Sequence, residues 1–102
     1  MGVPLFSLTP FRNWWIEEVV PNTDDPVRLS DAAPYIQNID AVIIQAKRSN
    51  KNVIYVGNSS KQIWELEAGE TVTLPIKDFT TIWIRRTPES TGDGINFIAG
   101  VY

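Results

Sequence analysis

The chain has 102 residues, of which 43% are hydrophobic and 21% are charged, and its formal net charge is −3. This length supports one hydrophobic core but not two, and the composition is that of a folded domain, so a second domain and a disordered chain are both disfavoured. The sequence contains no cysteine and no histidine. Disulfides, thiolate metal sites and the usual nucleophile–base pairs are therefore excluded.

The first ten residues, MGVPLFSLTP, lack the basic region that opens a signal peptide. The apolar run AVII at 41–44 is far shorter than the roughly 20 residues that span a bilayer. We expect neither export nor a membrane partner.

Residues 1–38 differ in composition from the rest of the chain. They contain five of the seven prolines and one of the six glycines, and their excess of acidic side chains accounts for the whole net charge. Proline interrupts regular structure and the asymmetry suggests a separate segment, so we expect an extended N-terminal arm or docking segment at 1–38 and a body at 39–102. Trp14 and Trp15 are adjacent, and in a strand they would face opposite sides.

The body reads as a series of short strands separated by turns. The segments with strand character are 39–49, 52–60, 62–70, 72–76, 80–87 and 95–102. The short connection between the first two predicts a hairpin. Strands at roughly ten-residue spacing predict an all-β, jelly-roll-like antiparallel β-sandwich. Its expected core side chains are Val72, Leu74, Ile76, Ile82, Ile84, Ile95 and Phe97.

The charged residues fit surface and turn positions better than a chemical site. Glu65 and Glu67 share one strand face, whereas catalytic carboxylate pairs usually face each other across a cleft. Asp24 and Asp25 belong to the turn-like run PNTDDP and Asp93 lies between two glycines, contexts in which aspartate commonly forms turns. The acidic pI of about 4.8 also disfavours a nucleic-acid partner. We expect no catalytic residue, metal or cofactor; a hydrolase using Glu65 and Glu67 ranks last.

Aromatic side chains are the most informative feature. There are eleven of them, and tryptophan brings a large apolar area that must be covered by the core or by a partner. The expected partner-interface residues are Phe11, Trp14, Trp15, Ile16, Trp83 and Tyr102. Two alternatives stay open: the rings cap the domain's own core, or Trp64 and Trp83 stack on the sugar rings of a glycan.

Three quoted stretches between residues 33 and 100 carry a family resemblance. They are APYIQNIDAVIIQAKRSNKNVIYVGNSS, the corner LEAGETVTLPI and the closing run STGDGINFIAG. In this order they resemble small β-structured virion proteins of tailed bacteriophages, although Trp83 and the connection RRTPES depart from the pattern.

The resemblance implies a non-enzymatic structural component of a virion, such as a capsid decoration, head-fibre or neck/tail-associated protein. Such a protein acts by self-assembly and by docking on other virion proteins, is assembled in the host bacterial cytoplasm, and is often a homo-oligomer with three-fold symmetry. The alternative function is a carbohydrate-binding module for attachment to the host surface.

Overall fold

The computed structural model describes residues 11–102, which form an all-β, sandwich-like fold with eight strands in two antiparallel sheets. The strands are β1 (Asn13–Val19), β2 (Val27–Arg28), β3 (Ala41–Ala46), β4 (Ile54–Gly57), β5 (Gln62–Leu66), β6 (Thr71–Leu74), β7 (Trp83–Arg86) and β8 (Ile95–Val101). Two single-turn helices are α2 (Leu29–Ala32) and η1 (Phe79–Thr81). Neither of these helices, which lie within residues 11–102, is long and apolar enough to cross a membrane.

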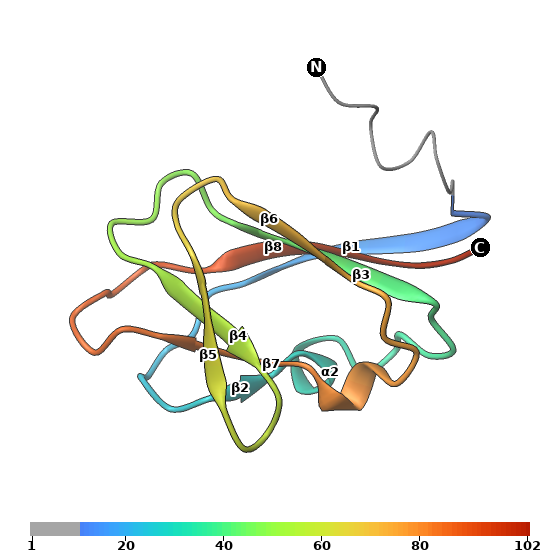
Figure 1. Ribbon diagram of the computed structural model, residues 1–102, viewed down its shortest axis with the longest axis horizontal. Helices are drawn as coiled ribbons and strands as arrows, with labels where there is room; N and C mark the ends of the chain where they lie inside the picture. The colour runs from blue at the N-terminus through green and yellow to red at the C-terminus, as the bar shows by residue number, and fades with distance from the viewer. Residues whose placement is uncertain (1–10) are drawn as a thin grey trace.

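The two sheets each contain four strands. Sheet 1 has the order β1-β8-β3-β6 and sheet 2 has the order β2-β7-β4-β5. Figure 1 shows sheet 1 above sheet 2, with the end of β8 beside the start of β1. Strands β5 and β6 each lie at the edge of their sheet.

One hydrophobic core lies between the sheets. Its largest fully buried side chains are Val42, Ile44, Ile95 and Phe97 from sheet 1, Ile54 and Ile84 from sheet 2, and Leu29 and Ile82 from the connecting segments. Each such side chain contributes roughly 1.5–3 kcal/mol when it leaves water. Phe79 of η1 contacts Phe97 of β8 with ring centroids 5.5 Å apart, which seats η1 against sheet 1.

The strand positions predicted for the body are confirmed, but the predicted hairpin between the first two strands is wrong. Strand β3 pairs with β8 and β6, whereas β4 pairs with β5 and β7, so the connection crosses from one sheet to the other. The side chain of Asn50 exchanges two hydrogen bonds with the backbone of Gly94, at 2.8 and 2.9 Å. These bonds hold the connection against the loop before β8 instead of closing a two-strand turn.

The structure also differs from the predicted boundary at residue 38. Strand β1 pairs with β8 along its whole length, from Asn13 opposite Val101 to Val19 opposite Ile95. Core residues from this part of the chain are Val19, Leu29, Ala33 and Ile36. The described prolines fall between the elements, so short apolar stretches remain free to pack. Residues 1–10 of the predicted arm lie outside the described residues.

Candidate functional site

The side of sheet 1 that points away from the core carries an apolar row. Ile16 of β1 lies opposite Ile98 of β8, and Ile98 lies opposite Ile43 of β3. Paired residues in an antiparallel sheet share a face, so the three side chains form one row across three strands. Ile16 is 59% exposed, and the other two are half-buried. We call this surface the outer face of sheet 1.

Aromatic rings extend the outer face at the end where the chain begins and ends. Trp14 lies opposite Gly100, and a Cβ atom at Gly100 would be only 2.3 Å from the ring of Phe11. Glycine at this position therefore lets the Phe11 ring cover the strand. The same ring stacks on Tyr102 with centroids 5.3 Å apart. Trp14 and Tyr102 are each about half exposed.

The expected interface residues thus lie in three different places. Phe11, Trp14 and Tyr102 join Ile16 at the outer face of sheet 1. Trp15 is half-buried and packs against the core, as expected for the opposite side of the strand from Trp14. Trp83, in contrast, belongs to sheet 2.

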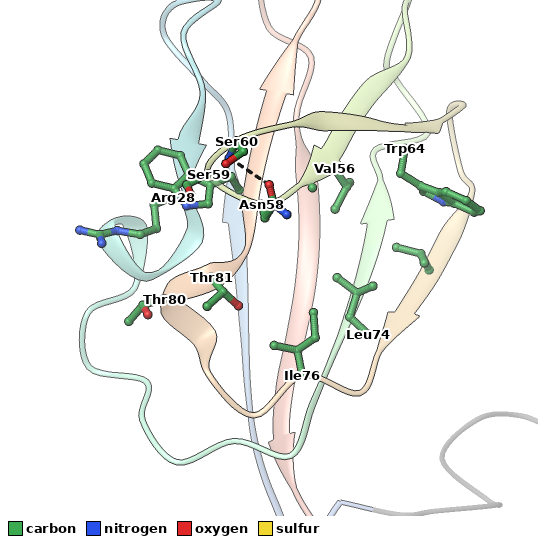
Figure 2. A pocket seen from close by; sticks show the side chains of 13 residues that line it. Arg28, Val56, Asn58, Ser59, Ser60, Trp64, Leu74, Ile76, Thr80 and Thr81 are labelled. Atoms are coloured by element: carbon green, nitrogen blue, oxygen red, sulfur yellow. Dashed lines mark hydrogen bonds between the residues drawn. The ribbon is translucent and has the colours of Figure 1, made fainter.

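A groove of about 940 Å³ lies between the edges of the two sheets. This is within the usual size range of small-molecule sites. Its apolar wall consists of Val56, Trp64, Val72, Leu74 and Ile76, which come from β4, β5, β6 and the residues after β6. Figure 2 shows Leu74 and Ile76 below Trp64, with Ser59, Thr80 and Thr81 toward Arg28. The groove forms because β5 and β6 are edge strands of different sheets.

Trp64 and Trp83, which the sequence proposed for glycan stacking, both line this groove. Trp64 lies opposite Val56 on the inward side of sheet 2, but its position on the edge strand leaves it 64% exposed. Trp83 is half-buried and lies under the guanidinium of Arg28, 5.7 Å from the ring centroid. The two rings, which are 19 residues apart in sequence, therefore line one groove, although strand pairing places them on opposite faces of sheet 2.

A tight loop, residues 57–60, forms the polar rim of the groove. The side-chain oxygen of Asn58 accepts hydrogen bonds from the backbone of Ser60 and Lys61, both at 2.9 Å. A Cβ atom at Gly57 would lie 1.9 Å from the carbonyl oxygen of Lys61, so glycine is required for this loop conformation. The hydroxyls of Ser59 and Ser60 form no hydrogen bond with the other described residues, which leaves them available to a ligand.

The groove has a mostly uncharged lining. Among the described residues, its lining contains one charged side chain, Arg28, which is paired with Asp31 at 2.9 Å. Beside it, the hydroxyl and then the backbone N–H of Thr80 donate to Asp78 and hold the pKa of that carboxyl below its usual range. The lining itself offers aromatic faces and hydroxyl groups.

The carboxylates considered for catalysis or metal binding lie elsewhere. Glu65 and Glu67 are exposed and are not part of the groove lining. Asp93 is 3% exposed, and its two oxygens accept hydrogen bonds from the backbone N–H groups of Lys51 and Asn52 at 3.0 and 2.9 Å. Within residues 11–102, no three Asp or Glu side chains gather as a metal site.

Sequence reasoning missed the outer-face contribution of Ile43 and Ile98 and the groove residues Val56 and Thr81. The two isoleucines lie in strands with apolar residues on both faces, a pattern that predicts apolar side chains on the outer side of the sheet as well as in the core. The groove residues carry no such signal, because the sheets meet there only in three dimensions.

Comparisons of the chain with protein-family models, curated protein sequences and solved structures give no match.

Proposed function

We propose that this chain is a non-enzymatic structural component of a tailed-bacteriophage virion, which acts by self-assembly and by docking on other virion proteins. The observation that carries the proposal is the outer face of sheet 1, where Ile16, Ile98 and Ile43 form an apolar row beside exposed aromatic rings. Apolar patches of this kind mark protein interaction sites. The resemblance of residues 33–100 to small virion proteins supplies the virion setting.

The chain connectivity supports the same proposal. Consecutive strands from β1 to β4 alternate between the sheets, and β1 and β8, the first and last strands, are neighbours in sheet 1. We propose that this order is a jelly roll, which is a recurrent architecture of viral capsid domains. The fold by itself does not define a function, so the docking surface carries the argument.

The docking proposal can be tested in phage particles. Ile43→Lys places a charge on the outer face in β3, one of the two inner strands of sheet 1. Ile63→Lys is the matched control, since Ile63 is 72% exposed and belongs to sheet 2. We expect particles purified from cells that carry the encoding phage genome to retain the wild-type and Ile63→Lys chains and to lose the Ile43→Lys chain. Absence of the wild-type chain from the particles would contradict the virion role.

A second candidate function is carbohydrate binding, and one observation favours it. Trp64 and Trp83 line the same groove as Ser59 and Ser60, whose hydroxyls form no hydrogen bond with the other described residues. A flat apolar ring that packs against a sugar, together with nearby hydroxyl donors, is an arrangement that can hold a glycan. In a virion protein such a groove would serve attachment to the host surface.

Glycan binding is testable with two neighbouring residues of β5. Trp64→Ala removes a groove ring, and Ile63→Ala removes an equally exposed apolar side chain that is absent from the lining. If the groove binds a glycan, array signals and calorimetric titration should be lost in Trp64→Ala and kept in Ile63→Ala. A wild-type chain that is silent on the array would argue against this candidate.

A further inference from the structure

Strand β1 is an open sheet edge. It has one hydrogen-bonded neighbour, β8, among the described residues. Proteins commonly protect such edges with proline, lysine or a bulge, because the unpaired N–H and C=O groups can accept another strand. Residues 13–19 contain neither proline nor lysine, and their register with β8 runs without a shift. Within the described part of the chain no strand covers this edge. The Trp14 N–H donates to the side-chain oxygen of Asn13 at 3.0 Å, an exposed local bond that an added strand would replace.

The outer side of this strand is self-complementary. Alternate positions of β1 carry Trp14, Ile16 and Glu18, and Arg12 lies in the bend directly before the strand. The backbone N–H of Arg12 donates to the carbonyl of Val101 at 2.7 Å, which keeps Arg12 beside the end of β8. If two copies are aligned antiparallel with residue 15 opposite residue 15, each arginine faces the glutamate of the second copy. The tryptophan then faces the isoleucine, and two-fold symmetry makes every such pair twice.

We propose that two copies of this chain pair through β1 about a two-fold axis at Trp15, which joins their two copies of sheet 1 into one continuous sheet. The inference rests on the proposed self-assembly and deepens it, because it names the partner as a second copy and the symmetry as two-fold. On the inward side, the same alignment sets Asn13 opposite Glu17, whose Oε2 atom accepts from the hydroxyl of Tyr35; the Asn13 amide can donate to the second carboxylate oxygen.

Neighbouring registers are less favourable. An alignment centred on Ile16 places Trp14 opposite Glu18, and one centred on Trp14 places Arg12 opposite Ile16. An alignment centred on Glu17 brings that carboxylate against its own symmetry copy. Cross-strand pairing is weaker when a charged side chain faces an apolar one and when two like charges face each other. Of these registers, the proposed one pairs apolar side chains with apolar ones and opposite charges with each other.

The required side chains are accessible. Arg12 is exposed and forms no salt bridge with any residue of the described range. The Oε2 atom of Glu18 lies 2.6 Å from the Nζ atom of Lys47, and the Glu18 side chain remains 55% exposed, which leaves its second oxygen for a further donor. Trp14 and Ile16 are 53% and 59% exposed, so pairing would bury apolar area as well as backbone groups.

A charge-exchange experiment tests this register. Arg12→Glu and Glu18→Arg each place like charges opposite one another in the proposed dimer, and each variant should weaken dimerisation about tenfold or more. A mixture of the two variants restores opposite charges at every position, as does the double variant Arg12→Glu/Glu18→Arg. We expect both preparations to dimerise again. Lys47→Gln is the control, because it removes the contact of Glu18 within the chain and leaves β1 unchanged.

The readout is light scattering coupled to size-exclusion chromatography of the full chain over roughly 1–100 µM, the range in which moderate affinities are measured. Circular dichroism and thermal unfolding of each variant show that the monomer still folds. Single variants that dimerise like wild type, or a mixture that stays monomeric, would overturn the proposal. So would a wild-type chain that is monomeric or trimeric. Particle incorporation is scored separately: a trimer found in virions would refute β1 pairing and leave the proposed function intact.

Discussion

Asp93 offers a sharp test of how the fold is held together, because a buried carboxylate joins two loops. Its oxygens accept from the backbone N–H groups of Lys51 and Asn52 at 3.0 and 2.9 Å, while its own exposure is 3%. Asp93→Ala leaves both N–H groups without their acceptor. A buried donor that loses its partner costs about 1–3 kcal/mol.

The lower part of that range applies, because Lys51 and Asn52 are exposed and water can reach their backbone. Two donors then give about 2–3 kcal/mol, a large share of the roughly 5–15 kcal/mol that stabilises a typical domain. Urea unfolding followed by circular dichroism should show this loss, together with a fall in Tm of roughly 10–20 °C.

Two further variants of this kind separate the hydrogen bonds from a general effect of charge. Asp93→Asn keeps one acceptor oxygen but turns an amide toward a backbone N–H, so we expect a loss smaller than that of Asp93→Ala. Asp25→Ala removes an exposed carboxylate and should change stability by less than about 0.5 kcal/mol. If Asp93→Ala unfolds within that same margin of wild type, the two hydrogen bonds do not hold the loops and the reasoning is refuted.

Three more predictions follow from the structure. Thr80→Val removes the hydroxyl that contributes most to the lowered pKa of Asp78, so NMR titration should show this pKa rising toward its usual value. In wild type the pKa of Asp78 is lower in the folded state than in the unfolded state. The stabilisation of the fold by the ionised Asp78 is therefore present above the unfolded-state pKa and is lost as the pH falls through the folded-state pKa. If the Asp78 titration is unchanged in Thr80→Val, the Thr80 hydroxyl is not the cause of the lowered pKa. Gly100→Ala should displace the Phe11 ring and lower the free energy of unfolding by about 1 kcal/mol in urea titrations, and unchanged ring chemical shifts would contradict this. Phe97→Ala should cost about 3–5 kcal/mol by the same method, since its side chain is 1% exposed, and a loss under about 1 kcal/mol would place it outside the core.

The predicted site residues show that strand periodicity can predict which face of a strand a side chain occupies. The adjacent Trp14 and Trp15 had to face opposite sides of a strand, and they do. The same rule places Ile82 and Ile84 in the core, and both are buried, at 1% and 0% exposure. Periodicity of two is a local property of an extended backbone, so it can be read without knowing which strands are neighbours.

Neighbour relationships could not be read in this way. The prolines around residues 13–19 indicate an extended arm, yet β8 supplies a pairing partner about 80 residues later in the chain. The apolar row of Ile16, Ile98 and Ile43 and the shared groove of Trp64 and Trp83 depend on the same kind of distant pairing. Hydrogen bonding between strands is a contact between segments, and a single segment does not specify its partner.

Local patterns in the chain are enough to predict an all-β fold, the places of most strands of the body, and the apolar side of several strands. These properties follow from composition, turn residues and alternation, each of which acts within a few residues. Packing in three dimensions was needed to establish how the strands divide between two sheets, which rings share a surface and which strand edge stays open. Those features arise when packing of the common core selects among pairings that are locally equivalent.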